Sequence, residues 1–140
     1  MRRRRKKEES ELKKQIIRTD RAPLPAGSYS QAVKLGPTVY VAGTCPFELG
    51  SKKVLHPGDT AAQTKLVLEY ISAILEEAGT SIDRVLKVTA FLDDLDEFAD
   101  YDREYAKFFP ADPPARSTVE IGKFPPGMKV EIECIAYIPD

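Results

Sequence analysis

The stretch Pro113–Glu133, PPARSTVEIGKFPPGMKVEIE, decides the fold of this 140-residue chain. Pro113 and Pro114 fix the backbone angle φ and lack an N–H group, so the approach to Arg116 is stiff and lies outside any helix. Alternating and β-branched residues then predict a strand over 116–121, and a longer strand is predicted over 128–138. A proline-rich bend separates the two strands.

The longer predicted strand has two unlike faces. Because side chains alternate along a strand, one face is apolar and the other carries two carboxylates followed by apolar residues. The first face holds Val130, Ile132, Cys134, Ala136 and Ile138, and the second holds Glu131, Glu133, Ile135 and Tyr137. A carboxylate on a half-buried face is unfavourable unless a partner pairs with it. We expect Arg116, at the head of the neighbouring strand, to be that partner.

Working outward, two helices and one further strand precede this stretch. Apolar residues at helical spacing predict a core helix over 61–78, which Asp59 or Thr60 would cap and Gly79 would end. An apolar run predicts a strand over 85–92. A second helix is predicted over 97–109, and its aromatic stripe favours a role in the core or in a subunit interface. That stripe consists of Phe98, Tyr101, Tyr105 and Phe108.

The N-terminal half begins with a predicted hairpin, whose strands cover 29–35 and 38–42 around a Gly36-Pro37 turn. The long loop over 43–59 is of the kind that often borders a site. The element order ββαβαββ predicts an α+β fold, with a mixed sheet of about six strands and two helices packed on one face.

Composition limits the classes of function. One domain is expected at this length, and no segment has the length and apolar character needed to cross a bilayer. Two cysteines favour reduced thiols and a cytoplasmic location over a disulfide framework. A single histidine, His56, argues against histidine-based metal sites and catalytic triads within one chain.

Charge divides the chain into a basic extension and an acidic body. Residues 1–21 carry ten Lys or Arg against four Asp or Glu, whereas residues 22–140 carry eleven against eighteen. We expect residues 1–20 to be a flexible or only fractionally helical basic extension, and residues 21–140 to form the domain. A solvated tail is favoured over an RNA-binding arm, and acidic residues in the extension disfavour a mitochondrial presequence.

The motif PARS ends at Ser117, and VEIEC begins at Val130. Two further motifs precede them, AGSYSQAV around residue 30 and VYVAG ending at Gly43. In this collinear order the motifs resemble the RidA/YjgF family of reactive-intermediate deaminases, and the resemblance covers about residues 22–138. The resemblance implies a chorismate-mutase-like fold, a homotrimer with clefts between subunits, and no metal or organic cofactor.

The resemblance also assigns roles to individual residues. It implies that Arg116 binds the substrate carboxylate, that Glu131 positions and activates water, and that the Thr118 carbonyl contacts the imine nitrogen. A two-point guanidinium grip suits the first task. Tyr29 would line the pocket. The alternatives are a structural ion pair for Arg116, a solvent-facing strand position for Glu131 and a half-buried strand aromatic for Tyr29; Glu133 is the weaker acid candidate.

Three positions depart from the family's pattern, although Gly43 keeps it. Asp102 stands where many of these deaminases have an asparagine, so a possible donor becomes an acceptor. Ala42 stands where a serine is usual, and Gly27-Ser28 replaces a common Gly-Pro. The substrate-binding set implied here is therefore Tyr29, Ala42, Gly43, Asp102 and Thr118, with an open question over substrate preference.

The implied activity is hydrolysis of 2-aminoacrylate or 2-iminopropionate-type intermediates to 2-keto acids and ammonia. One alternative is a pathway-specific deaminase for a larger amino-acid-like compound. Another is a non-catalytic protein of the same fold that binds small carboxylates or RNA. The acidic body argues against a large phosphate-binding surface, so nucleic acid is not expected as a partner. The resemblance implies a small imino or enamino carboxylate as the partner, and no membrane partner is expected.

Overall fold

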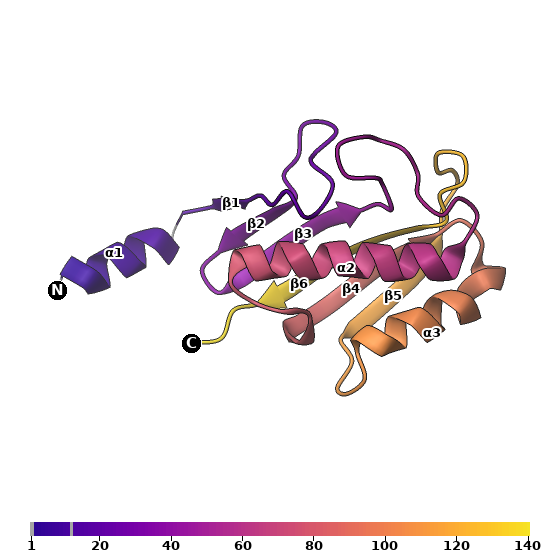
Figure 1. Cartoon of the computed structure of the whole chain (residues 1–140). Coiled ribbons are helices and arrows are strands. Elements are labelled where there is room, and N and C mark those ends of the chain that lie inside the picture. Colours follow the sequence, from indigo (N-terminus) through magenta and orange to yellow (C-terminus); the bar gives the residue numbers. More distant parts are fainter. Residues whose placement is uncertain (1, 12) are drawn as a thin grey trace.

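The computed structural model describes residues 2–11 and 13–140, and within these residues six strands form one mixed sheet with two long helices on one face (Figure 1). This arrangement confirms the predicted α+β class. The strands are β1 (Gln15–Ile17), β2 (Ala32–Leu35), β3 (Thr38–Thr44), β4 (Val85–Leu92), β5 (Ala115–Glu120) and β6 (Val130–Tyr137). The helices are α1 (Arg2–Glu11), α2 (Thr60–Ala78) and α3 (Phe98–Phe108), with short 3₁₀ turns at Ile82–Arg84 and Leu95–Glu97.

The strand order is β1-β2-β3-β6-β4-β5, and β4 and β5 are the parallel pair. The sequence led us to expect the strands of Arg116 and Glu131 to be neighbours. This expectation is wrong, because β4 lies between them. The connection through α3 makes β5 parallel to β4, which requires a crossover. The chain then returns to fill the position between β3 and β4, which short-range patterns do not reveal.

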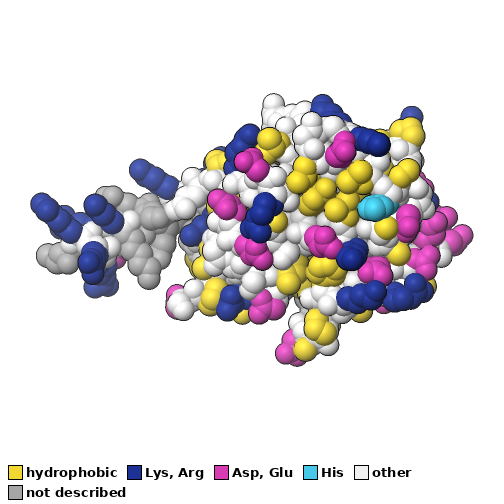
Figure 2. All heavy atoms as spheres, in the orientation of Figure 1, with side chains coloured by type: hydrophobic (Ala, Val, Ile, Leu, Met, Phe, Trp, Pro, Cys, Tyr) yellow, Lys and Arg dark blue, Asp and Glu magenta, His cyan; other side chains and the backbone are white. Residues whose placement is uncertain are grey.

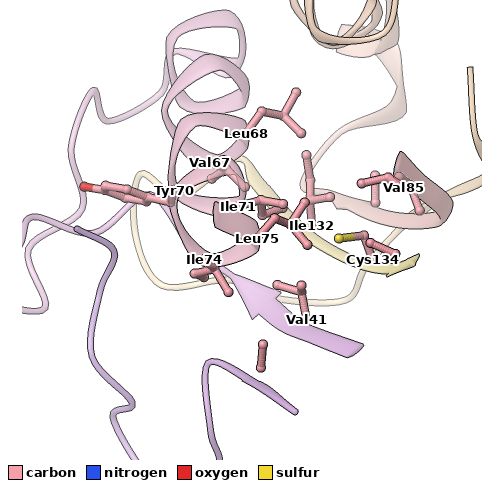
Figure 3. Close-up of a cluster of buried hydrophobic side chains, with 14 of the residues drawn as sticks. Val41, Val67, Leu68, Tyr70, Ile71, Ile74, Leu75, Val85, Ile132 and Cys134 are labelled. Carbon is pink, nitrogen blue, oxygen red and sulfur yellow. The ribbon is translucent and has the colours of Figure 1, made fainter. Parts of the chain in front are cut away.

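Helix α2 supplies most of the apolar cover of the sheet (Figure 3). Asp59 caps it by accepting a hydrogen bond from the Ala62 N–H at 3.0 Å, and Gly79 ends it in a left-handed conformation with φ of 92°. Ile71 and Leu75 are fully buried against Ile132 of the sheet. The predicted helix and both of its ends are confirmed.

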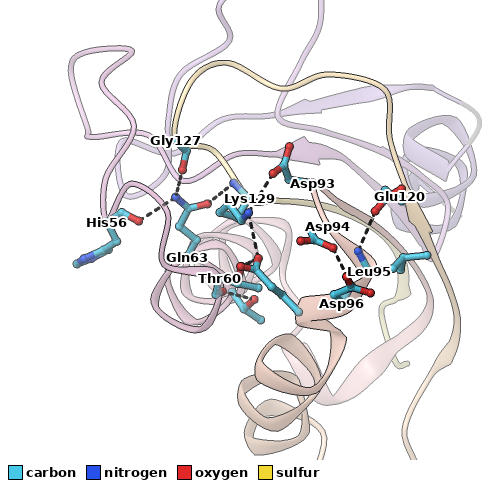
Figure 4. Close-up of polar contacts among 12 residues, drawn as sticks. His56, Thr60, Gln63, Asp93, Asp94, Leu95, Asp96, Glu120, Gly127 and Lys129 are labelled. Atoms are coloured by element: carbon cyan, nitrogen blue, oxygen red, sulfur yellow. Dashed lines mark hydrogen bonds and ion pairs between the residues drawn. The ribbon is translucent and has the colours of Figure 1, made fainter.

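A polar network holds the start of β6 (Figure 4). The Lys129 ammonium lies 3.0 Å from an Asp93 carboxylate oxygen and 3.1 Å from one of Glu97. The fully buried Gln63 accepts a hydrogen bond from the Lys129 N–H at 2.7 Å and donates one to the Gly127 carbonyl at 2.8 Å. This network fixes the backbone two residues before Glu131.

The N-terminal region forms a helix and a short edge strand. Residues 2–11 form helix α1, where an exposed Arg4–Glu8 pair at 3.4 Å spans one turn, and Figure 2 shows basic side chains along it. Residues 15–17, which we assigned to the extension, instead form β1 and pair with β2. Ile17 is buried in the core cluster, so a short edge strand within a charged sequence was missed. No described helix is long and apolar enough to cross a membrane.

The hairpin β2–β3 forms as predicted, but it begins later. Strand β2 starts at Ala32, so Tyr29 lies in the preceding loop, where its hydroxyl accepts a hydrogen bond from the Ala26 N–H at 3.0 Å. The Gln31 side chain holds this loop through four hydrogen bonds to backbone groups of Thr19, Ala22 and Pro23. These hydrogen bonds tie together the segments on both sides of Tyr29.

Candidate active site

The residues implied as a site form two clusters. We call Arg116, Asp102, Thr118 and the rings around Arg116 the arginine cluster. We call Glu131, Cys45, Gly43, Ala42 and Tyr29 the carboxylate cluster. The first joins α3 to β5, and the second joins the end of β3 and its following loop to β6.

In the arginine cluster, Asp102 and the aromatic stripe of α3 fix the guanidinium. An Arg116 N–H donates a hydrogen bond to an Asp102 carboxylate oxygen at 2.8 Å. The guanidinium carbon lies 4.5 Å from the centroid of the Tyr105 ring and 5.2 Å from that of Tyr101. Phe98 lies at 5.3 Å. Such contacts between a cation and ring faces stabilise an arginine that is shielded from water.

Burial sets the charge states in this cluster. The Arg116 side chain is 23% exposed, and burial alone would lower its pKa, but the hydrogen bond with Asp102 and nearby groups outweigh burial and raise the pKa. Burial raises the pKa of Tyr101 and Tyr105, so both phenols stay neutral at physiological pH. The Tyr101 hydroxyl lies 3.2 Å from the hydroxyl of Thr118, two residues after Arg116, and this contact joins α3 to β5.

In the carboxylate cluster, Glu131 lies between Gly43 and Cys45. The Cys45 thiol donates a hydrogen bond to Glu131 Oε1 at 2.9 Å. A Cβ atom on Gly43 would lie 3.0 Å from the Glu131 carboxyl carbon and 3.1 Å from Oε2, so any larger residue would push this carboxylate from its present position. Burial, the hydrogen bond to Glu131 and its charge all raise the pKa of the Cys45 thiol, which stays protonated and able to donate.

A β-bulge creates this contact. Val41 of β3 pairs with Cys134, and Thr44 pairs with Ile132, so β3 has one residue more than β6 between these pairs. The extra residue lies at Ala42–Gly43, where the bulge bends β3. The glycine backbone can therefore approach the Glu131 side chain.

A cavity of about 30 Å³ adjoins the bulge. Its walls include Tyr29, Ala42, Gly43 and Cys45. This volume is enough for a water molecule. The structure thus brings the predicted residues Tyr29, Ala42 and Gly43 together around one cavity. Gly43 and Cys45 of this cavity also adjoin the Glu131 carboxylate.

The two clusters lie on opposite faces of the sheet. Arg116 pairs with Val88, which is buried under the helices, so Arg116 points to the helical side. Glu131 pairs with Phe91, which alternates with buried residues of β4, so Glu131 points to the side without helices. Two strand spacings and three residues separate their backbones, roughly 10 Å in each direction. The expected Arg116–Glu131 pair is therefore not formed within one chain.

Sequence reasoning missed two sets of side chains. Cys45 was interpreted only as a reduced thiol, and no local signal links it to Glu131, 86 residues away. The aromatic stripe was interpreted as part of the core or of a subunit interface, although Tyr101 and Tyr105 also surround Arg116. Residues three and four apart share a helix face, so the spacing of the aromatic residues placed them on the same face as Asp102. That shared face was the available signal. Glu133 pairs with Thr89 and lies on the same face of the sheet as Glu131, two residues further along β6.

Comparison with protein-family models gives a match over residues 19–138 to the family described as endoribonuclease L-PSP. A RutC family protein of Pyrococcus abyssi is 44% identical over 126 residues, which is 90% of this chain and 98% of that protein. Reactive Intermediate Deaminase A, chloroplastic, of Arabidopsis thaliana is 38% identical over 92% of this chain and 68% of its own length.

Solved structures agree with this result. RidA from the Antarctic bacterium Psychrobacter sp. superposes with a TM-score of 0.82 at 40% identity, covering 89% of this chain and 99% of that one. The E. coli protein TdcF, solved with bound serine, gives 0.82 at 38% identity, with the same two coverages.

Proposed function

The chain belongs to the RidA/YjgF/RutC (endoribonuclease L-PSP) family, and from this membership we propose that it is a deaminase of imines and enamines of 2-keto acids. The observation that carries the proposal is the guanidinium of Arg116, which ring faces and a carboxylate hold in a fixed position. The reaction adds water to the imine carbon of a substrate such as 2-iminopropionate and releases ammonia and a 2-keto acid.

Each cluster supplies one part of this reaction. Arg116 binds the substrate carboxylate with its planar fork, which orients the imine carbon. The Thr118 carbonyl accepts a hydrogen bond from the imine nitrogen. Glu131 accepts a proton from the attacking water, while Cys45 and Gly43 hold its carboxylate in place. Tyr29 lines the pocket beside the bulge.

A complete site requires two copies of the chain. Arg116 and Glu131 point to opposite faces of one sheet, so one small substrate cannot contact both within a chain. The face without helices also exposes apolar surface, including Tyr40 at 50% and Tyr137 at 41% exposure. Burying such a face favours association. The number of subunits comes from the family resemblance, which implies a homotrimer, and we infer that in it the arginine cluster of one subunit faces the carboxylate cluster of the next.

The direct test is ammonia release from freshly generated 2-iminopropionate and from several larger imino acids, measured beside the mass in solution. We expect turnover of at least one imine and the mass of a trimer by light scattering. A monomer at micromolar concentration would contradict the assembled site. Absence of turnover with all imines would contradict the deaminase activity.

A second candidate function is non-catalytic binding of small amino or keto acids. Asp102 already engages Arg116, and the related TdcF was solved with bound serine. Binding of such acids without turnover of any imine would favour this function. Loss of that binding in Arg116→Ala would assign it to the same cluster.

A further inference from the structure

Arg116 and Asp102 form a charge pair at the rim of the arginine cluster. The Arg116 side chain is 23% exposed, whereas that of Asp102 is 46% exposed. The aromatic rings of α3 shield the guanidinium, and the carboxylate lies further toward solvent. A ligand that reaches Arg116 therefore also comes near Asp102.

The pair leaves room for a ligand on both partners. Arginine has five N–H donors, and Asp102 takes one of them at 2.8 Å. Only Oδ1 of Asp102 has a hydrogen bond or ion pair within the described residues, so Oδ2 can accept a further donor. A cation and an anion thus stand side by side, each able to bind more.

This arrangement disfavours a ligand that is only an anion. A monoanionic carboxylate bound to Arg116 would stand near the Asp102 carboxylate, and like charges about 5 Å apart repel each other measurably even at a protein surface. A ligand with a carboxylate and a positively charged nitrogen avoids this repulsion, because its nitrogen can donate to Asp102 while its carboxylate binds Arg116. The positive nitrogen can be an ammonium or a protonated imine.

We propose that Asp102 makes the site selective for zwitterionic amino or imino acids over carboxylates without a positive nitrogen. The proposal rests on the proposed role of Arg116 in binding the substrate carboxylate. It names the charge class of the ligand: one carboxylate and one cationic nitrogen within reach of two neighbouring side chains. Keto-acid products, which lack this nitrogen, would then leave more readily than the substrate.

The test compares ligands that differ only in the charged nitrogen. Binding of L-alanine and L-lactate, and of L-serine and D-glycerate, is measured by calorimetry on the full chain at pH 7. We expect the wild type to favour each amino acid over its hydroxy acid by about fivefold to a hundredfold. In Asp102→Asn this ratio should fall severalfold, chiefly through tighter binding of the hydroxy acids.

Two control variants make the result specific. Asp100→Asn removes an exposed carboxylate of the same helix, which pairs with Arg103 at 3.4 Å, and should leave the ratio unchanged. Arg116→Ala should weaken the binding of both the amino acid and the hydroxy acid of each pair. An unchanged ratio in Asp102→Asn, an equal fall in Asp100→Asn, or full binding in Arg116→Ala would each overturn the proposal.

The same measurements separate this inference from the deaminase activity. If the wild type hydrolyses imines but Asp102→Asn keeps the ratio, the charge selectivity fails and the activity stands. If the ratio changes as expected while no imine is hydrolysed, the selectivity stands and the activity fails.

Discussion

The arginine cluster and the carboxylate cluster are built in different ways, although one reaction would use both. The arginine cluster is local: one helix, one crossover and one edge strand place Arg116 against Tyr105 and Asp102, within 15 residues of sequence. The carboxylate cluster depends on a bulge in β3 and on contacts across more than 80 residues. In the arginine cluster, a carboxylate and ring faces hold the guanidinium. In the carboxylate cluster, the absence of a side chain on Gly43 leaves space for the Glu131 carboxylate. The following variants test this division.

The largest effect is expected at Arg116. Arg116→Ala removes the group that we propose binds the substrate carboxylate, so kcat/KM for imine hydrolysis should fall about a thousandfold or more, while Arg116→Lys should lose about ten- to a hundredfold. Steady-state ammonia release measures both. Arg103→Ala, an exposed arginine of α3, is the matched control and should change little. Equal activity of Arg116→Ala and wild type would remove the arginine cluster from the site.

The next effect tests the carboxylate cluster through the bulge. In Gly43→Ala the new methyl group would lie about 3.0 Å from the Glu131 carboxyl carbon, so the carboxylate must move. A displacement of this kind should lower kcat by about ten- to a hundredfold with little change in ligand binding. Gly122→Ala is the control, because nothing lies within 4 Å of its added atom. Normal kcat in Gly43→Ala would show that the position of Glu131 does not matter.

A smaller effect is expected at Cys45. A thiol is a weak donor, so Cys45→Ala should lower kcat by about two- to tenfold with KM unchanged, and Cys45→Ser should restore most of the loss. Kinetics of the three proteins with one imine provide the comparison. If serine and alanine behave alike, the hydrogen bond to Glu131 does not position the carboxylate.

The two clusters should also respond differently to alkaline pH. A raised pKa in the folded state means that folding favours the protonated thiol, so this contribution is complete below the ordinary thiol pKa of 9.0 and is lost as pH rises above it. Folding also favours the protonated phenols of Tyr101 and Tyr105. Their contribution to stability is lost only as pH rises above the ordinary phenol pKa of 10.0.

Urea unfolding of wild type and Cys45→Ser at pH 7 to 10 measures this difference. The unfolding free energy of the wild type should decline from about pH 9, at most about 1.4 kcal/mol per pH unit for each thiol. Cys45→Ser should decline less steeply, and some slope should remain because burial raises the pKa of Cys134 to about 12. Identical slopes for the two proteins would contradict the protonated thiol beside Glu131.

Much of the fold could be predicted from hydrophobic periodicity and from the residues that begin and end helices and turns. Gly79 and Asp59 marked both ends of α2, and the apolar run over 85–92 matched β4, because these signals are local. The place of β6 between β3 and β4 could not be predicted this way, since strand order depends on long-range packing. β1 was missed because a three-residue strand is stabilised by its partner rather than by its own pattern.

The candidate site was predictable as a set of residues and not as an arrangement. Family motifs pointed to Arg116 and Glu131, but alternation along two strands does not say that their side chains lie on opposite faces when the strands are not neighbours. The bulge that seats Glu131 against Gly43 leaves no pattern in β3 beyond the glycine itself. Both features emerge only from strand register.

The central claim, that one site takes Arg116 from one subunit and Glu131 from another, is tested most directly by mixing two inactive variants. Arg116→Ala and Glu131→Gln are purified, unfolded together in equal amounts and refolded. In a ring with random mixing, about one quarter of the neighbouring pairs combine an intact arginine with an intact glutamate. Imine hydrolysis should therefore return to about one quarter of the wild-type rate. Mixed proteins that remain as inactive as either variant alone would contradict the claim.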